Sequence, residues 1–207
     1  MAHYGLNIAH PHTAHATIIR LVGSAKRILE VGCSAGYLSE MFTHTGCTVT
    51  AIELDQAEAE KARPYCSRII IGSIEDPNIL QAAAGTYDVI VCADVLEHLR
   101  SPLSVLERLG SYLHEDGCFI VSLPNVANWK VRISLLLGRF EYADEGILDR
   151  THLRFFTIAS ARQLLERAGC QIDQFHPAAT RMPLFLVRSF PSLFAVHLIF
   201  RARKRSR

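Results

Sequence analysis

The fold of this chain is decided by a short apolar run that ends in a turn of small residues. The run reads Ile28-Leu29-Glu30-Val31-Gly32-Cys33-Ser34-Ala35-Gly36-Tyr37. A second apolar run, 48–53, ends in the acid Glu53. A strand, a glycine turn, a helix and a second strand tipped with a carboxylate are typical of a nucleoside pocket. Backbone N–H groups face the ligand at the helix N-terminus, and the acid accepts hydrogen bonds from ribose hydroxyls.

Composition indicates one globular domain. The 207 residues are enough for a large core, and 49% of them are apolar. A net charge of +2 gives no general attraction for polyanions, so we expect no nucleic-acid partner. The six cysteines form no CxxC pair and no zinc spacing. This pattern is typical of a reducing compartment, and we expect a cytoplasmic protein.

The two ends of the chain bear on targeting. Residues 1–4 lack the basic patch and apolar stretch of a secretory signal. The longest apolar stretch, 182–200, is interrupted by charge and proline, so we expect no membrane span. Basic residues follow it directly, which leaves open a weak contact of the basic C-terminus with a membrane surface. We favour the plainer interpretation of a last strand with a basic tail.

Short apolar runs alternate with helical patterns, which predicts a parallel sheet with helices on both faces. Strands are expected at 27–31, 48–53, 68–72, 87–93, 118–123, 170–175 and 194–201. Helices are expected at 13–22, from the glycine turn to Gly46, from Asp55 to before Pro64, at 77–84, from Ser101 to before Gly117, and at 158–168. In the helix that opens at Ser101, leucines 103, 106, 109 and 113 repeat at helical spacing.

The alternation of strand and helix patterns stops at Pro124. Residues 125–157 are rich in aromatic and charged residues and show no clear strand pattern. We expect this segment to be an insertion that lies over the carboxyl edge of the sheet.

The glycine turn admits three interpretations. A dinucleotide fingerprint, G-x-G-x-x-G, needs glycine where Ser34 and Tyr37 stand. The same residues spell G-x-S-x-G, the nucleophile elbow of hydrolases, but that elbow normally follows several strands and an oxyanion loop. The third interpretation is the first motif of class I S-adenosylmethionine (AdoMet) methyltransferases. The chain resembles their D/E-x-G-x-G-x-G turn through Glu30, Gly32 and Gly36, with Ser34 in place of the middle glycine.

Later motifs extend this resemblance. Glu53 stands where the family binds the ribose hydroxyls, and Leu54 stands beside the adenine. The run Gly72-Ser73-Ile74-Glu75 is similar to the adenine-contacting segment, often G-D-x-E. The run 87–99 is similar to the family signature F/Y-D-x7-L-E-H-L. The resemblance implies a set of cofactor-binding residues: Glu30, Gly32, Cys33, Ser34, Gly36, Tyr37, Glu53, Leu54, Ser73, Ile74, Cys92, Ala93 and Asp94.

The same resemblance implies the architecture. We expect a single α/β methyltransferase domain over 1–207, with a Rossmann-like, doubly wound, seven-stranded and mostly parallel sheet whose last strand is antiparallel. We expect an acceptor-binding lid at about 124–157. Residues 149–157, D-R-T-H-L-R-F-F-T, resemble AdoMet methyltransferases of bacterial cell-surface polysaccharide and related small-molecule pathways. AdoMet is then the cofactor, and a small molecule such as a sugar or glycan intermediate is the acceptor.

His152, in that lid segment, is the candidate catalytic residue. It can act as a general base or orient the acceptor hydroxyl; the alternative is a histidine that fixes the shape of the lid. Asp94, Glu97 and His98 resemble the E-x-x-E-H cluster of ubiquinone-pathway O-methyltransferases, some of which bind a divalent cation. We expect no metal here. We also expect a helical cap over the cofactor, with Tyr4 or His15 nearby.

Two functional alternatives remain open at this point. The first is a non-catalytic, AdoMet-binding regulatory protein, which would keep the cofactor motifs without turnover. The second is a hydrolase with Ser34 as its nucleophile. Acceptors similar to ubiquinone phenols are the runners-up to sugars.

Overall fold

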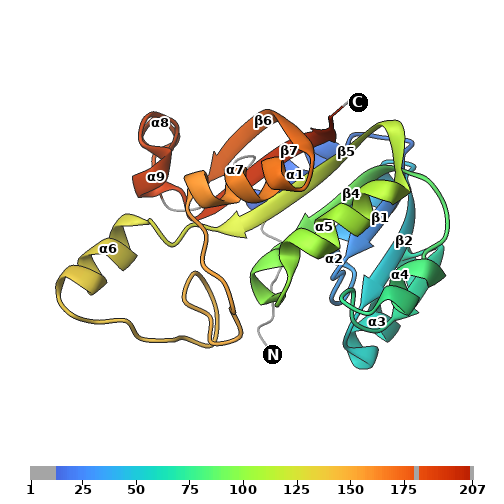
Figure 1. The fold of residues 1–207 in the computed structure, drawn as a ribbon, viewed down its shortest axis with the longest axis horizontal. Coiled ribbons are helices and arrows are strands. Elements are labelled where there is room, and N and C mark those ends of the chain that lie inside the picture. Colours follow the sequence, from blue (N-terminus) through green and yellow to red (C-terminus); the bar gives the residue numbers. More distant parts are fainter. Residues whose placement is uncertain (1–12, 180–181, 206–207) are drawn as a thin grey trace.

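The computed structural model describes residues 13–179 and 182–205, and these contain a seven-stranded sheet, whose arrangement is drawn in Figure 1. The strands are β1 (Arg27–Val31), β2 (Thr48–Glu53), β3 (Arg68–Ile71), β4 (Tyr87–Ala93), β5 (Leu113–Pro124), β6 (Cys170–Ala178) and β7 (His197–Lys204). Their order is β3-β2-β1-β4-β5-β7-β6. All pairings are parallel except those of β7, which runs antiparallel to β5 and β6. The expected mostly parallel sheet with an antiparallel last strand is confirmed.

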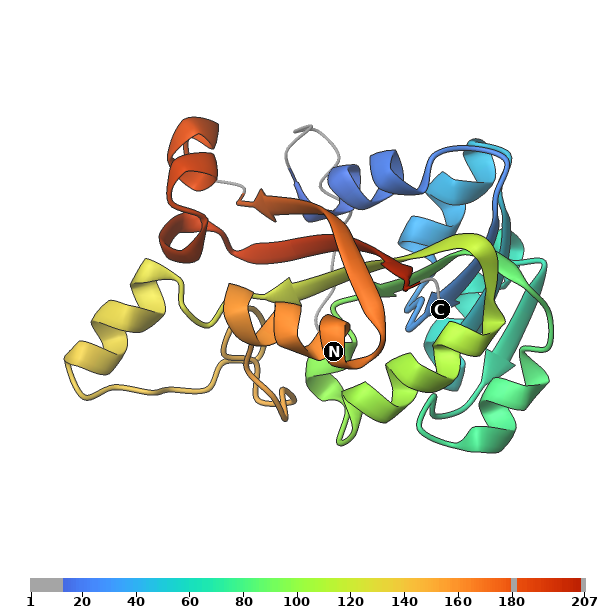
Figure 2. The same cartoon turned by 45° about the horizontal axis from the view of Figure 1, so that its top comes forward.

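Helices cover both faces of the sheet, as Figure 2 shows. They are α1 (Ala14–Val22), α2 (Tyr37–His44), α3 (Gln56–Ala62), α4 (Pro77–Ala82), α5 (Pro102–Leu109), α6 (Trp129–Leu136), α7 (Ile158–Arg167), α8 (Leu184–Ser189) and α9 (Pro191–Phe194). Three short 3₁₀ turns are η1 (Arg63–Tyr65), η2 (Leu96–His98) and η3 (Gly110–Tyr112). Side chains of α1, α2 and α3 pack on one face, and those of α4, α5, α7 and α8 on the other. The strands lie between two apolar cores, which explains their nearly continuous apolar sequences.

Several helices begin where the sequence predicts, because their caps are local. Thr13, Asp55, Asp76 and Thr157 are N-caps whose side chains accept hydrogen bonds from the first turns of α1, α3, α4 and α7. Thr157 and Ser160 form a reciprocal capping box on α7.

Two predicted boundaries around β5 are wrong. Leu113 is the first residue of β5 and not part of the preceding helix, and Gly117 lies inside β5. Tyr87 pairs with Leu113 and Val89 with Cys118, so residues 114–117 stand opposite the single residue Asp88. This irregularity adds a polar, exposed stretch to the beginning of the strand, so the predicted strand at 118–123 lacks the first five residues of β5.

The C-terminal strands also differ from expectation. β6 extends to Ala178, three residues beyond its predicted end, and β7 starts at His197 and not at residue 194. The apolar run before β7 forms the short helices α8 and α9, which follow Pro183 and begin at Pro191 respectively. Proline favours the first turn of a helix, but helices of six and four residues are too short to show a helical period in the sequence.

The segment expected as an insertion leaves the sheet after β5. It contains α6, which projects from the body of the molecule in Figure 1. Its two ends are joined, because Asn125 and Phe156 form a bridge and the Val126 N–H donates to the Phe156 carbonyl at 2.9 Å. The buried Asn125 side chain also donates to the carbonyls of Ser192 and Ala195. The segment is therefore anchored on α9 at its root.

The basic C-terminus is largely structured. Arg201 and Arg203 lie in β7, and both pair with Asp173 of β6, at 2.5 and 3.2 Å. Among the helices of the described residues, none has the length and apolarity needed to cross a membrane.

Removal of the α7 cap tests this account of the fold. Thr157 Oγ1 accepts from the Ser160 N–H at 3.2 Å, and Ser160 Oγ accepts from the Thr157 N–H at 2.9 Å. We expect Thr157→Ala to lower the free energy of unfolding by about 1 kcal/mol. Thr157→Ser keeps the hydroxyl and should stay close to the parent protein. Urea denaturation followed by circular dichroism measures both, and equal stabilities of the two variants would contradict the cap.

Candidate active site

The glycine turn between β1 and α2 adopts a backbone that few residues allow. Gly32, Ser34 and Gly36 have φ angles of 72°, 48° and 83°. A Cβ on Gly32 would lie 2.6 Å from a methyl carbon of Val95, and one on Gly36 would lie 2.8 Å from Cα of Ala62. Both positions therefore require glycine. Ser34 tolerates the left-handed conformation and is exposed, so the missing middle glycine does not close the turn.

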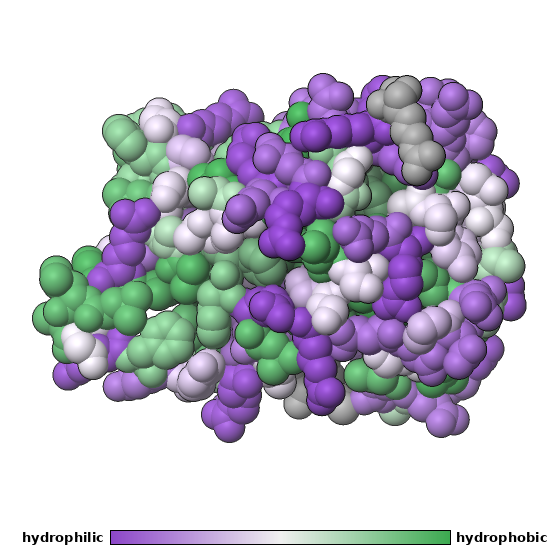
Figure 3. All heavy atoms as spheres, viewed as in Figure 1, coloured by the Kyte–Doolittle hydropathy of each residue, from purple (hydrophilic) through white to green (hydrophobic). Residues whose placement is uncertain are grey.

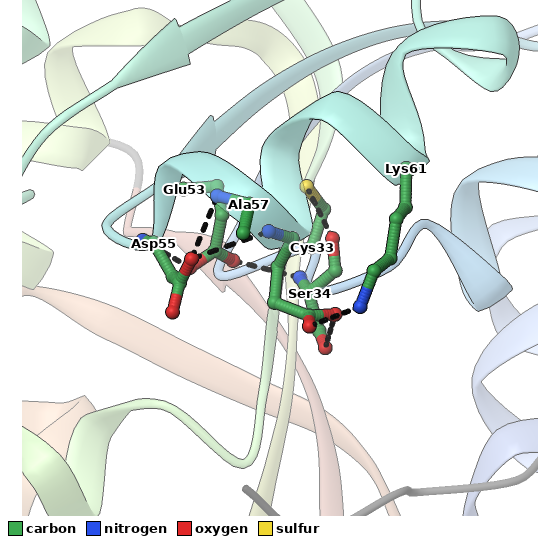
Figure 4. Close-up of polar contacts among 7 residues, drawn as sticks. Cys33, Ser34, Glu53, Asp55, Ala57 and Lys61 are labelled. Carbon is green, nitrogen blue, oxygen red and sulfur yellow. Dashed lines mark hydrogen bonds and ion pairs between the residues drawn. The ribbon is translucent and has the colours of Figure 1, made fainter.

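Glu53, at the end of β2, ties this turn to the next loop (Figure 4). One carboxylate oxygen accepts from the Ser34 N–H at 2.7 Å. The other accepts from the N–H groups of Leu54 and Asp55, at 2.8 and 2.9 Å. A carboxylate has about four acceptor positions, so Glu53 can hold this loop and still accept from a ligand hydroxyl.

Apolar and polar groups suited to a purine flank Glu53. Leu54 is 70% exposed beside it. Ser73, which follows β3, accepts a hydrogen bond from the Glu75 N–H at 3.2 Å, and Ile74 is buried. Tyr37 is half-buried at the first position of α2. Because β1, β2 and β3 are parallel neighbours, these groups meet at one edge of the sheet.

Three predicted cofactor residues turn their side chains away from this edge. Cys92 is fully buried in the core, and burial raises the pKa of its thiol to about 12. Cys33 is buried in the other core and its thiol donates to the Ser34 carbonyl at 3.5 Å. Glu30 is buried and accepts from the Ser39 hydroxyl at 2.5 Å. Because their side chains are buried, Cys92 and Cys33 can contact a ligand only through their backbone atoms. Glu30, on β1, instead binds Ser39 and so holds α2 against the sheet.

Ser34 does not have the neighbours of a hydrolytic nucleophile. Its hydroxyl lies 3.5 Å from a carboxylate oxygen of Glu58, and no histidine of the described residues hydrogen-bonds to it. A serine nucleophile needs an adjacent base within hydrogen-bond reach. The geometry therefore disfavours the hydrolase interpretation.

The end of β4 carries a second polar group. Asp94 has a φ angle of 52°, an unusual value for a residue with a side chain. Its carboxylate accepts from the Ser122 hydroxyl at 2.6 Å and lies 3.5 Å from Nε2 of His197. His197 was missed by sequence analysis, because no motif marks it. The antiparallel direction of β7 could have indicated it, since the first residue of such a strand lies at the carboxyl edge of its parallel neighbours.

His152 is brought to the same region but is enclosed. It is buried, and its Nδ1 lies 3.1 Å from the Ile147 carbonyl, so this nitrogen carries the proton. Its Nε2 lies 4.0 Å from a carboxyl oxygen of Glu97. Burial lowers the pKa of His152. These contacts favour the alternative role of fixing the lid, and catalysis by His152 stays a prediction.

Glu97 anchors the segment 149–154 to the loop that follows β4. Its backbone carbonyl accepts from the N–H groups of Leu153 and Arg154, at 2.9 and 3.0 Å. Within the described part of the chain, neither oxygen of its buried carboxyl has a hydrogen-bond partner. Burial raises the pKa of this carboxyl well above its usual value. A neutral acid beside a neutral imidazole needs no counter-ion.

The described residues contain one cluster with metal-ligand chemistry. Glu97, His98 and His152 each offer an atom within 4.8 Å of the others. Asp94 is not part of it, because its carboxylate faces Ser122 and His197. The prediction that no metal binds here remains open to test.

The N-terminal histidine cluster is only partly described. His15, in α1, is half-buried, and burial lowers its pKa, while Asp94 acts in the opposite direction. His15 therefore lies near the Asp94 end of β4, and its approach to the cofactor stays a prediction. Tyr4 lies outside the described residues.

The fold and the edge it builds define a class of protein. The sheet order, the glycine turn and the ribose-type acid are those of a class I AdoMet-dependent methyltransferase. A family model described as a methyltransferase domain matches residues 9–174, and the chain belongs to this family. The residues fit its cofactor: the turn has no side chain at Gly32 or Gly36 to obstruct it, and Glu53 has acceptor capacity left.

The chain is similar in sequence to named O-methyltransferases and in fold to a solved methyltransferase structure. The chain is 35% identical over 156 residues to the ubiquinone biosynthesis O-methyltransferase of Nitrosococcus oceani, covering 72% of this chain and 65% of that protein. It is 34% identical over 135 residues to the protein of the same name from Actinobacillus pleuropneumoniae, covering 61% of this chain and 57% of the relative. The chain thus spans less than two thirds of the length of these relatives. Magnesium protoporphyrin IX methyltransferase from Synechocystis, solved with bound SAH, shares the fold: the TM-score is 0.67 at 15% identity, over 99% of this chain and 90% of that one.

The buried acid under the turn makes stability depend on pH. Burial raises the pKa of Glu30 from 4.5 to about 8. The folded state therefore holds a proton that the unfolded chain releases, and this contribution to stability is lost as pH rises toward that value. We expect Glu30→Gln, which keeps an acceptor for Ser39, to gain stability relative to the parent protein as pH rises from about 5 to 8.

Denaturant titrations at a series of pH values measure this difference. Glu107→Gln, at an exposed position on α5, is the matched control and should follow the parent curve. Parallel stability curves for Glu30→Gln and the parent would show that Glu30 is charged in the folded state.

Proposed function

We propose that this protein is an AdoMet-dependent methyltransferase that O-methylates a small polar acceptor, such as a sugar or glycan intermediate. One observation carries the proposal. The Glu53 carboxylate holds the glycine turn and the following loop through three backbone amides, at the carboxyl edge where parallel sheets bind nucleosides. Membership of the methyltransferase family supports the same reading.

In this proposal, residues of the chain bind AdoMet and orient its methyl group toward the acceptor. When bound, AdoMet supplies a methyl group on a positively charged sulfur. Glu53 would accept hydrogen bonds from the ribose hydroxyls, and Leu54, Ser73 and Ile74 would border the adenine. The backbone amides of the turn would hold the methionine portion. Alignment is the main task in such a transfer, because a displacement at carbon needs the nucleophile in line with the leaving sulfur.

The proposed acceptor site lies over the ends of β4, β5 and β7. Polar side chains gather there: Asp94 and His197 face one another, and Thr151 Oγ1 lies 3.1 Å from Nδ1 of His98. Such groups suit an acceptor with several hydroxyls. Residues 124–157 border this edge through the bonds of Leu153 and Arg154 to Glu97, which supports their role as the acceptor lid.

A second acceptor class has specific support. Phe140, Tyr142 and Phe155 form a cluster of aromatic rings whose centroids are 5.5–6.4 Å apart. Apolar side chains also gather over α6 and the residues that follow it (Figure 3), where Leu136 is 85% exposed. A phenol with an apolar tail fits such a surface, and the two curated relatives are named for ubiquinone biosynthesis.

Cofactor binding is tested by calorimetry with AdoMet and its demethylated product. We expect both to bind, and we expect Glu53→Ala to weaken binding about 10- to 100-fold, since a hydrogen bond to a charged group contributes about 1.5–3 kcal/mol. Glu60→Ala removes the same charge from the exposed face of α3, where Glu60 pairs with Arg63, and should bind as the parent does. Absence of binding by the parent protein would refute the proposal.

Acceptor class is tested by measuring demethylated cofactor formed with a panel of sugars, nucleotide sugars and prenylated phenols. We expect turnover with a hydroxyl-rich member. Turnover with phenols alone would move the function to the second acceptor class. Tight AdoMet binding without turnover of any acceptor would instead favour a non-catalytic, regulatory role.

A further inference from the structure

We propose that His197, positioned by Asp94, is the general base that removes the acceptor's hydroxyl proton. This inference rests on the O-methyl transfer proposed above and assigns its proton to a residue that no sequence motif marks.

The strand directions bring this pair to the reacting edge. His197 is the first residue of β7 and stands opposite Pro124, the last residue of β5. Asp94 directly follows β4, and its N–H donates to the Ser122 carbonyl of β5 at 3.2 Å. Val95, the next residue, packs against Gly32 of the glycine turn. The pair therefore lies beside the turn that receives the cofactor, on the side of β4 away from Glu53.

The geometry suits a base with an orienting acid. Asp94 Oδ2 lies 3.5 Å from Nε2 of His197, and the Ser122 hydroxyl donates to Asp94 Oδ1 at 2.6 Å. A proton on Nε2 directed at the carboxylate leaves Nδ1 as the proton acceptor, and no described residue hydrogen-bonds to Nδ1. The two side chains are 30% and 27% exposed, so an acceptor can reach them. Distances of this kind commonly tighten when substrate binds.

His197 and Asp94 account for the proton that the acceptor hydroxyl loses during methyl transfer. The hydroxyl oxygen forms the new bond to the methyl carbon, and the carbon–sulfur bond breaks with its electron pair on sulfur. The hydroxyl proton passes to Nδ1 of His197. The Asp94 carboxylate then opposes the positive charge of the imidazolium, as a carboxylate does in other acid–histidine pairs.

The other histidines near this edge are less suited than His197 to act as the general base. His15 of α1 also lies near Asp94 and His197, and burial lowers its pKa, which disfavours a second positive charge beside the base. Asp94 and His15 are two titratable groups that lie near this position. His152 is enclosed between Ile147 and Glu97, and the Nδ1 of His98 faces Thr151.

The test uses the full chain with an acceptor that it methylates. We expect His197→Gln to lower kcat/KM about 10²- to 10⁴-fold, the usual contribution of a general base, with unchanged AdoMet affinity in calorimetry. The rise of rate with pH should disappear in this variant. Added imidazole should restore activity to His197→Ala, which a purely structural histidine would not allow. His176→Gln, on β6, is the matched control and should behave as the parent.

A double-mutant cycle tests the role of Asp94. We expect Asp94→Asn to lower kcat/KM in the parent protein but to change it little in His197→Gln, because a positioning residue acts only through the base that it orients. Parent activity and pH profile in His197→Gln, or equal losses from Asp94→Asn in both backgrounds, would overturn this assignment and leave the methyltransferase function intact. No turnover by the parent protein would overturn both.

Discussion

The carboxylate of Glu53 is the contact on which the cofactor edge depends. It belongs to the end of β2 but holds the turn that follows β1, so one side chain fixes the separation of two loops. The turn itself has left-handed backbone at three positions, and the Glu53 contact adds to the backbone hydrogen bonds that Gly32 and Gly36 donate to Ile52 and Cys33. A negative charge facing backbone amides at the start of α2 and α3 is also favourable to both helices. The Glu53 carboxylate thus both fixes the two loops and offers the acceptor position for a ligand hydroxyl.

A second constraint is the direction of β7. If this last strand ran parallel to β5, His197 would lie at the opposite edge of the sheet, far from Asp94. Running antiparallel, β7 brings a histidine from near the end of the chain to the strand ends that carry the cofactor loops. The edge is therefore built from both halves of the sequence. The first half supplies the nucleoside-type pocket, and the second supplies the polar groups on the acceptor side.

The first half could be predicted from sequence almost residue by residue. β1, β2, β4 and the start of α3 lie where apolar runs and caps indicate, because each signal is local. The irregular start of β5 could not be predicted, since residues 114–117 have no partner pattern of their own. The helices α8 and α9 were missed, because six and four residues are too few to show a helical period. In the site, Glu53 was indicated by spacing, whereas the burial of Glu30 and Cys92 and the approach of His197 depend on strand packing that a motif does not encode.

The joined ends of the segment 125–156 have a consequence for how such a protein can diversify. The bridge between Asn125 and Phe156 closes the excursion at its root, and the buried Asn125 amide secures that root on α9. The loop-closure entropy depends only weakly on the length of what lies between the ends. Evolution can therefore lengthen, shorten or replace this segment while the sheet and its glycine turn stay unchanged. One scaffold of this kind can be adapted to acceptors of different size by exchange of a single peptide.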